Sequence, residues 1–389
     1  MKKLWIDLPA FAPDYSGVCS ALYELGGVSV IHDASGCTGN YTGYDEPRWY
    51  GGSGKVFCSG LREIDAVLGR DDKLIDEVLY AAEDLNPTLL AVLGSPVPMV
   101  IGSDMGGIAQ ELEARSGLPA FCFSTNGLSL YNKGVSQAVT ALLRRFAEPT
   151  EERVPRGINL LGMTPLDLGS GSNAADLADC LIRAGYSVLG RLMMGVSLDQ
   201  LRMVDQAQVN LVVTQSGLAA AKLLQHRFNT PYVAALPLGD GAEACHLLEQ
   251  TLEDGVSRCL SDPAAEGDIL IVAEQLLGNA LRRALLTRAP DRRVTVATMF
   301  GLDPALAAEG DLDLPAEEDL RSVLASGRFR VLVGDPLFEQ LIPPDRPLGF
   351  QPLPHPAVSS KLYWDQVPRY LGPEMDALLQ NILHADTNS

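Results

Sequence analysis

Short apolar runs alternate with amphipathic stretches along nearly the whole chain, and this alternation limits the fold more than any other feature. Runs such as 88–93 (TLLAVL) have the length and composition of buried strands. Stretches such as 71–84 and 133–146 have helical spacing. Strands that alternate with helices form βαβ units and parallel sheets. The sequence therefore predicts an α/β protein.

The runs fall into three blocks, separated by polar segments at 148–157 and 261–268. The expected strands are 88–93, 118–123, 158–161, 186–189, 209–213, 232–236, 269–273, 294–298 and 329–333, and the expected helices are 71–84, 133–146, 173–184, 197–207, 217–228 and 374–383. We expect three open parallel-sheet, Rossmann-like domains at 1–153, 154–263 and 264–389. Ligands of such sheets bind outside the carboxyl ends of the strands, so a central cleft is expected between the domains.

Composition excludes several classes of function. A formal net charge of −19 over 389 residues repels phosphate backbones and anionic lipids, so neither nucleic acid nor a membrane is an expected partner. No apolar run reaches the roughly 18 residues that span a bilayer, and the N-terminal stretch lacks the apolar core of a signal peptide. We expect a cytoplasmic protein. Its seven cysteines then favour metal binding or thiol chemistry over disulfides.

Two glycine-rich segments resemble nucleotide motifs and fail the test. The segment 51–55 (GGSGK) lacks the first glycine of a phosphate loop and has Val56 where Ser or Thr is required. The segment 169–174 (GSGSNA) is not followed by the acidic residue that binds a ribose, since Gly190 and Arg191 occupy that region. A loop and a helix N-terminus explain these segments better.

Three cysteines near the N-terminus are the strongest candidates for chemistry. Cys19, Cys37 and Cys58 each lie in or beside segments with the composition of loops: SGVCS, ASGCTGN and FCSGL. An iron-bound thiolate needs open backbone and N–H donors around the sulfur, and glycine allows a close approach. These residues form no short ligand motif, so their spacing alone leaves metal binding and a plain buried thiol both open.

The segment 35–50 (SGCTGNYTGYDEPRWY) resembles the nitrogenase component 1 family, which includes the light-independent protochlorophyllide reductases and the reductive cyclase of nickel-tetrapyrrole synthesis. Gly36-Cys37, after Cys19, matches the family's pair of cluster cysteines, and EPRW (46–49) is similar to a segment of the protochlorophyllide enzymes. Further similar segments are 61–78, 89–112 and 209–213. The resemblance implies an iron–sulfur cluster, most simply [4Fe–4S], with Cys19 and Cys37 as ligands.

Several positions depart from the family pattern. The family's third cluster cysteine falls at Ser95 or Pro96 here. We expect Cys58 to replace it; alternatively Cys58 is a buried thiol and the missing ligand comes from a partner. Thr214 stands where nitrogenase has a cysteine that binds its catalytic cofactor, and His355 lies where the family has a second ligand. A threonine hydroxyl is a poor iron ligand, and His355 between two prolines has the context of a loop residue, so both are retained only as residues of a candidate pocket.

The resemblance implies an enzyme, an iron–sulfur oxidoreductase subunit that takes electrons from an ATP-dependent iron–sulfur reductase and reduces an unidentified substrate, with tetrapyrroles as one class. It also implies a homodimer, or a heterodimer with a homologous subunit. Nearby charged residues, Asp33, Asp45, Glu46 and Arg48, would tune the cluster or relay protons, or else form a solvated loop. The alternatives are a scaffold for metallocofactor assembly and a metal-free binding protein.

Overall fold

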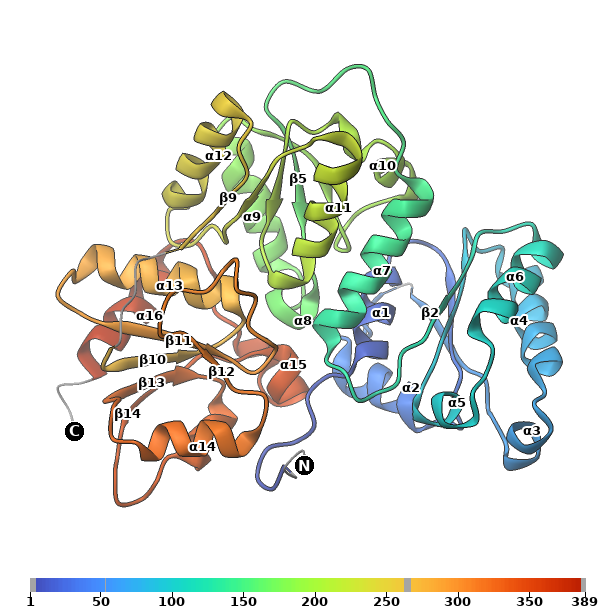
Figure 1. Cartoon of the computed structure of the whole chain (residues 1–389), viewed down its shortest axis with the longest axis horizontal. Coiled ribbons are helices and arrows are strands. Elements are labelled where there is room, and N and C mark those ends of the chain that lie inside the picture. Colours follow the sequence, from blue (N-terminus) through green and yellow to red (C-terminus); the bar gives the residue numbers. More distant parts are fainter. Residues whose placement is uncertain (1–4, 53, 262–266, 386–389) are drawn as a thin grey trace.

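The strands of the computed structural model form three sheets, which follow one another along the chain (Figure 1). The structure describes residues 5–52, 54–261 and 267–385. Every paired strand in these sheets runs parallel to its neighbours. The predicted α/β fold with three parallel sheets is therefore confirmed.

The sheets contain four, five and five strands. The first has the order β2-β1-β3-β4, with β1 Val28–Ile31, β2 Lys55–Cys58, β3 Leu90–Leu93 and β4 Ala120–Phe123. The second has the order β6-β5-β7-β8-β9, with β5 Gly157–Leu161, β6 Ser187–Arg191, β7 Val209–Val212, β8 Tyr232–Ala234 and β9 Arg258–Cys259. The third has the order β12-β11-β10-β13-β14, with β10 Ile269–Val272, β11 Val294–Thr298, β12 Leu312–Asp313, β13 Val331–Gly334 and β14 Gly349–Pro352.

Helices cover the sheets on both faces, as parallel sheets require (Figure 1). In the first part of the chain they are α1 Asp14–Leu22, α2 Gly36–Asn40, α3 Glu63–Leu68, α4 Asp71–Leu85, α5 Pro96–Ile101, α6 Met105–Ser116 and α7 Tyr131–Phe146. In the middle they are α8 Pro165–Leu168, α9 Ser172–Arg183, α10 Leu198–Arg202, α11 Leu218–Phe228 and α12 Ala242–Asp254. In the last part they are α13 Gln275–Arg288, α14 Glu317–Ala325, α15 Pro356–Ser359 and α16 Pro373–His384.

The first sheet shows why these residues form strands. Val28 and Val30 of β1 face a core shared with α4 and α6, whereas Ile31 belongs to the core that contains α1 and α7. In β3, Leu90 and Val92 join the first of these cores, and its other residues join the second. Because side chains alternate across a strand, a short run that is apolar throughout buries both faces.

Each sheet has a point where the chain reverses its direction of strand addition: between β1 and β3, between β5 and β7, and between β10 and β13. Loops leave the carboxyl ends of these two strands in opposite directions, which opens a crevice at this switch point. Four of the residues described below, Asp33, Ser95, Glu274 and Asp335, lie in loops that leave the strands at these points.

Helices α1 and α7 pack in unusually close contact on one side of the first sheet. A methyl group at Gly17 would overlap the carbonyl oxygen of Tyr131, and one at Gly134 would overlap the carbonyl oxygen of Asp14. Only glycine at both positions allows the two backbones to come this near. Helix α7 also contacts α10 and α11, so the helix pair joins the first sheet to the second.

Most expected elements are present, with three differences besides the short strands β9, β12 and β14, which are not among the expected strands. Cys19, expected beside a loop, lies within α1, where Ser16 and Gly17 serve tertiary contacts rather than a turn. The helix expected at 197–207 ends at Arg202 and continues as a 3-10 turn, Val204–Gln206. Strands β1 and β2, of four residues each, were not among the expected elements. Of the expected linker 261–268, residues 262–266 lie outside the described part of the chain.

The close contact between α1 and α7 can be tested with Gly134→Ala. We expect a loss of about 1–3 kcal/mol in the free energy of unfolding, because the added methyl group forces two packed backbones apart. The matched control is Gly106→Ala in α6, where a methyl group meets only ordinary contacts and alanine favours the helix. Urea unfolding of both variants measures the difference; equal stabilities would contradict the packing described.

Candidate functional site

The first switch point is organised by the carboxylate of Asp33, which follows β1. Its Oδ2 accepts hydrogen bonds from the backbone N–H groups of Ser35 at 3.0 Å and Cys37 at 2.8 Å. Ser95, which follows β3, donates its hydroxyl to the carbonyl of His32 at 2.9 Å and lies 3.4 Å from Asp33 Oδ1. Asp33 therefore fixes the turn that begins α2 and presents Cys37.

Cys58 joins the same site from the end of β2. Strand β2 pairs with β1 so that Cys58 is opposite Ile31. The thiol donates to the carbonyl oxygen of Asp33 at 3.3 Å, and the N–H of Gly60 points to the sulfur at 3.3 Å. Cys37 and Cys58 are both partly exposed. The four residues Asp33, Cys37, Cys58 and Ser95 are called the Asp33 site below.

Cys19 differs from the other two cysteines because it is fully buried in α1. Burial raises the pKa of its thiol well above the ordinary value, and the charge of Glu46 adds to the effect. Burial also raises the pKa of Cys37, against hydrogen bonds from Tyr15 and Ser95 that lower it. Tyr15 lies one turn before Cys19 on α1, so Cys19 is on the helix face that leads to Cys37.

The Asp33 site partly fits the expected iron–sulfur cluster. Two cysteines contact Asp33, Cys37 through the carboxylate and Cys58 through the main-chain carbonyl, and the sulfur of Cys58 already has the N–H donor that cluster ligands require. In the part of the chain that the structure describes, no three His, Cys, Asp or Glu side chains converge on a single metal ion. A cluster differs in placing each thiolate on a different iron atom. Cys19, Cys37 and Cys58 remain predicted ligands.

Asp33, Asp45 and Glu46 are buried and the side chain of Arg48 is only 9% exposed, so the solvated-loop interpretation is wrong for these residues. Arg48 forms a bidentate ion pair with Glu46: its Nε donates to Oε1 at 2.7 Å, and its Nη2 donates to Oε2 at 2.8 Å. Tyr41 donates its hydroxyl to the same carboxylate at 3.0 Å. Asp45 accepts from Ser16 and from Asn40, both at 2.7 Å. Fully satisfied partners of this kind make a buried charge tolerable.

A second group of polar residues lies where the three sheets meet. Asp167 accepts from the hydroxyl of Tyr131, and its Oδ1 lies 3.3 Å from Nε2 of His355. Glu274 lies two residues after β10 and Asp335 directly follows β13, at the switch point of the third sheet. We call these five buried residues the acid–histidine cluster. Burial and the charge of Asp167 raise the pKa of Glu274, and burial raises that of Asp335.

The two predicted pocket residues have structural roles. Thr214 donates its hydroxyl to the carbonyl of Gly162 at 2.6 Å and lies 2.7 Å from the Ser216 hydroxyl. His355 begins α15: its N–H donates to Asp335 at 2.9 Å, and its Nδ1 accepts from the N–H of Ala357 at 3.3 Å. No hydrogen bond links Thr214 to His355 in the described chain. An acidic residue one position after the apolar run 269–273, and another two positions after the run 329–333, are the sequence signal for Glu274 and Asp335.

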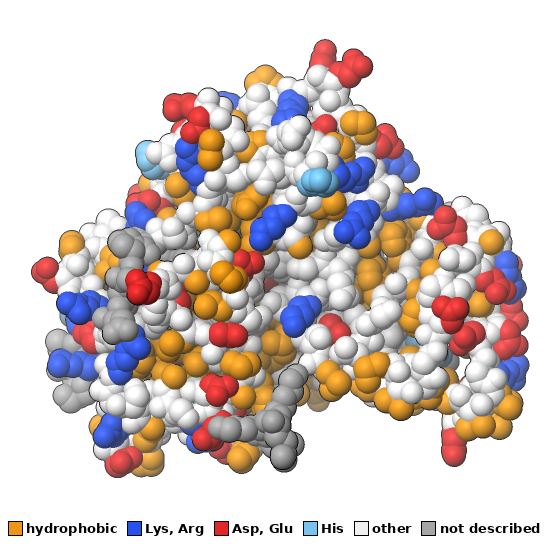
Figure 2. Space-filling model, in the orientation of Figure 1, with side chains coloured by type: hydrophobic (Ala, Val, Ile, Leu, Met, Phe, Trp, Pro, Cys, Tyr) orange, Lys and Arg blue, Asp and Glu red, His pale blue; other side chains and the backbone are white. Residues whose placement is uncertain are grey.

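An open groove of about 580 Å³ lies beside the acid–histidine cluster. It is lined by the first turns of α7 and α11 and by the loop after β11, at 300–304, and we call it the three-sheet groove. Figure 2 shows the hollow near the centre of the molecule, with basic side chains around it. The groove agrees with the expected position of a ligand site, outside the carboxyl ends of β7 and β11.

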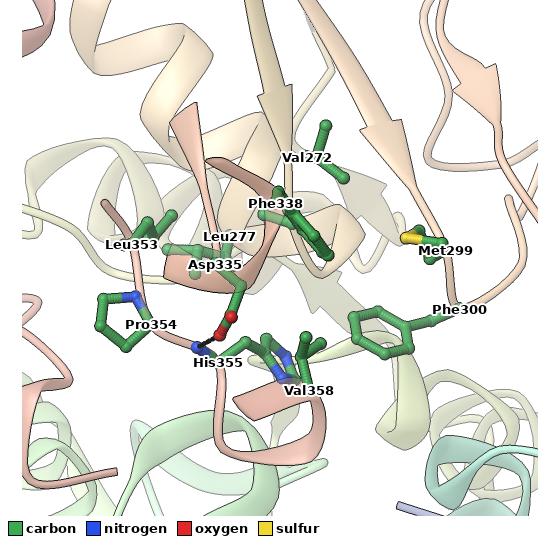
Figure 3. Close-up of a pocket in the computed structure, with 11 residues that line it drawn as sticks. Val272, Leu277, Met299, Phe300, Asp335, Phe338, Leu353, Pro354, His355 and Val358 are labelled. Atoms are coloured by element: carbon green, nitrogen blue, oxygen red, sulfur yellow. Dashed lines mark hydrogen bonds between the residues drawn. The ribbon is translucent and has the colours of Figure 1, made fainter. Parts of the chain in front are cut away.

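A small cavity lies behind the groove. It measures about 10 Å³, the room that one water molecule needs, and is lined by apolar side chains with Asp335 and His355 (Figure 3). Phe300 lines both the cavity and the groove, and its ring centroid lies 4.7 Å from that of His355. Phe300 is thus the wall that separates the acid–histidine cluster from the groove.

Comparison with known proteins agrees with the fold and with the resemblance found in the sequence. A family model described as nitrogenase component 1 type oxidoreductase matches residues 14–247. A subunit of the light-independent protochlorophyllide reductase of Leptolyngbya boryana is 24% identical over 181 residues, 44% of this chain and 36% of that protein. The nitrogenase iron-molybdenum cofactor biosynthesis protein NifE of Nostoc is 22% identical over 277 residues, 68% of this chain and 53% of that protein. The chain therefore matches about a third to a half of these relatives' length.

A solved structure shows the same architecture. The structure titled "Nitrogenase Cp1 at pH 5" superposes with a TM-score of 0.69 at 15% identity, covering all of this chain and 90% of the other. At this identity the likeness establishes the fold and nothing finer. Among the described helices, none has the length and apolar character needed to cross a membrane.

The buried carboxyl of Asp45 predicts a specific pH dependence of stability. Burial raises its pKa to about 7, although hydrogen bonds from Ser16 and Asn40 oppose the shift. Between about pH 4 and pH 7 the folded protein therefore binds a proton that the unfolded chain has lost, and the free energy of unfolding falls as pH rises. Asp45→Asn should remove up to about 4 kcal/mol of this decline.

Urea unfolding at several pH values between about 4 and 8 measures the slope. The control is Asp254→Asn, because Arg258 lowers the pKa of Asp254 to about 2, below this window. Glu274 leaves part of the slope in every variant, since its pKa is also raised. If Asp45→Asn and the wild type have the same slope, Asp45 is already ionised in the folded protein.

Proposed function

The chain belongs to the nitrogenase component 1 type oxidoreductase family, and on that premise we propose that it is an iron–sulfur oxidoreductase subunit. In this proposal it accepts electrons from a separate ATP-dependent iron–sulfur reductase and reduces a small-molecule substrate, with tetrapyrroles as one candidate class. The observation that carries the proposal is the Asp33 site. It brings two partly exposed cysteines together at a switch point.

Cys37 and Cys58 are the residues best placed to hold a [4Fe–4S] cluster, with Cys19 as the third predicted ligand. Such a cluster supplies one-electron transfer. The thiols must lose their protons to bind iron, so binding is favoured by conditions that ionise Cys37. Asp33 holds the Cys37 turn in place, and Gly60 donates its N–H to the Cys58 sulfur.

The buried charges behind the Asp33 site would assist without touching substrate. The pKa of Asp45, raised to about 7, allows its carboxyl to gain or lose a proton near neutral pH. Glu46 and Arg48 form a neutral pair, and Arg48 also donates to the carbonyl of Ser20 at 2.9 Å on α1. Arg48 therefore ties the segment after Cys37 to the helix that carries Cys19.

An exposed apolar surface beside the Asp33 site supports a dimer. Large hydrophobic side chains are exposed on β2, α3 and α5, and we call this surface the apolar face: Phe57, Ile64, Val67, Leu68, Val97, Met99, Val100 and Ile101. Figure 2 shows hydrophobic side chains along the lower right edge, over α3 and α5. Exposed large hydrophobic side chains that gather on one side of a protein mark an interface. We propose that a second copy or a homologous subunit covers it.

A second function, assembly of a metallocofactor, is favoured by one comparison. The relatives at similar identity include NifE proteins, whose name assigns them to cofactor biosynthesis. Thr214, with its hydroxyl engaged by Gly162, offers no thiolate to such a cofactor. Reductase-dependent turnover separates the two functions, because a scaffold carries metal without substrate turnover.

The cluster is tested by anaerobic purification and measurement of iron and sulfide. We expect about four iron atoms per cluster in the wild type, and a loss of most iron in Cys37→Ala and Cys58→Ala. Cys19→Ala, the third predicted ligand, should also lose iron. The matched control is Cys259→Ala, a partly exposed cysteine of the second sheet, which should keep it. If Cys19→Ala keeps all of its iron while the other two variants lose theirs, Cys19 is a residue of the core and not a ligand. If the wild-type protein holds no iron even after reconstitution, the proposed function is contradicted.

The dimer is tested with Val100→Glu. Val100 is 78% exposed on the apolar face, so a carboxylate there leaves the monomer folded but cannot be buried in an apolar interface. We expect light scattering to show a dimer for the wild type and a monomer for Val100→Glu. Val256→Glu is the control, at a residue 55% exposed in the middle of the chain, far from α5 in sequence. A monomeric wild type, or a dimer in both variants, contradicts the proposed interface.

A further inference from the structure

We propose that the three-sheet groove binds an organic anion, one that carries carboxylate or phosphate groups. The inference names the class of ligand for the substrate cleft and rests on the proposed function only for the reaction that follows binding. Its basis is the charge and the hydrogen-bonding groups that line the groove.

The size and construction of the groove are those of a ligand site. Its volume of about 580 Å³ falls within the range of about 300–1,000 Å³ common for small-molecule sites. Asn132 joins its walls: its amide donates to Gln215 Oε1 at 3.2 Å and to the carbonyl of Phe300 at 2.9 Å. Gln215 in turn donates to the carbonyl of Gly301 at 2.6 Å. The floor is therefore fixed by hydrogen bonds between all three parts of the chain.

Positive charge in the groove exceeds negative charge, although the chain as a whole carries −19. The charged lining residues are Lys133, Lys222 and Asp303. No ion pair of Lys133 is found in the described part of the chain, and Lys222 lies 3.8 Å from Asp303. Asp303 already accepts the N–H of Ala305 at 2.9 Å. Two lysines in an acidic protein thus face the groove with only one carboxylate, which is partly engaged.

Two helices add to this field because both begin at the groove. Asn132 and Lys133 are in the first turn of α7, which has 16 residues, and Leu218 and Ala219 open α11, which has 11. Several first N–H groups of these helices already have acceptors, since Lys133 donates to the carbonyl of Leu130 at 3.1 Å and Leu218 to that of Gln215. The N-terminal end of each helix dipole still carries partial positive charge. Anions are stabilised at such positions. The lysines and the two helix ends therefore select the same sign of charge.

Isothermal titration with citrate tests the inference, with triethyl citrate as the uncharged counterpart and inorganic phosphate as the alternative anion. We expect citrate to bind, triethyl citrate not to bind, and added salt to weaken citrate binding. Binding of citrate more tightly than phosphate assigns the site to carboxylates, and the reverse order assigns it to phosphates. Absence of binding by both anions overturns the inference.

Substitutions locate the binding. Lys133→Gln and Lys222→Gln should each weaken citrate binding about fivefold, the effect of losing one partly screened ion pair. Asp303→Asn should strengthen it, because a competing carboxylate is removed. The matched control is Arg144→Gln in the last turn of α7, about 16 Å along the helix from Lys133, which should leave binding unchanged. An equal effect of Arg144→Gln would mean that general surface charge attracts the anion.

The two proposals fail separately. Iron is measured in the same preparations: protein without iron that binds citrate retains the anion site and loses the oxidoreductase function. Protein that holds iron but binds neither anion retains the proposed oxidoreductase function and loses the anion site. Melting temperatures of the variants confirm that each is folded.

Discussion

The contact between α1 and α7 is the constraint on which both candidate sites depend. Its closeness is set by Gly17 and Gly134, where any side chain would strike the partner's backbone. Helix α1 supports the Asp33 site and the charged residues near it. Tyr15 hydrogen-bonds to Cys37, Ser16 donates to Asp45, and Ser20 accepts from Arg48. From the other member of the pair, Tyr131 reaches Asp167 and Asn132 reaches the groove. A shift of one helix against the other would therefore disturb two sites at once.

Buried carboxyl groups are the second organising feature. Some are paired with a cation, and others have a raised pKa. Glu46 is fully buried, and Arg48 and Tyr41 complete the hydrogen bonds of its carboxylate. Among the residues that the structure describes, no cation lies beside Asp45 or Glu274, and burial raises the pKa of both carboxyls. Protonation removes the cost of an unpaired buried charge near neutral pH. The same choice leaves a protonated carboxyl close to each candidate site, one behind Cys37 and one beside Asp167.

The sequence predicted the sheets well because the signal for a buried parallel strand is local. The run 294–298 became β11 without change, and 71–84 became α4 with one added residue. The sequence does not predict β1 (VSVI) and β2 (KVFC) because Ser29 and Lys55 shorten their apolar runs, whereas β3 (LAVL) and β10 (ILIV) are apolar throughout. Cys19 was placed beside a loop because Ser16 and Gly17 have loop composition; their reasons for being in a helix, Asp45 and the backbone of α7, are distant in sequence. The sequence predicts His355 as a pocket residue but not its grouping with the other members of the acid–histidine cluster, because the five residues come from five separate elements.

The positions of the switch points explain how one chain can separate two tasks. Those of the second and third sheets bring Thr214, Glu274 and Asp335 into the region where the sheets meet, beside the three-sheet groove. The first switch point instead places Cys37 and Cys58 next to the apolar face, where a partner would exclude water. In the proposed function electrons would enter at the Asp33 site, and substrate would bind in the three-sheet groove. Because Tyr131 and Asn132 open α7 and α7 packs against α1, the route between them is one pair of helices in direct contact.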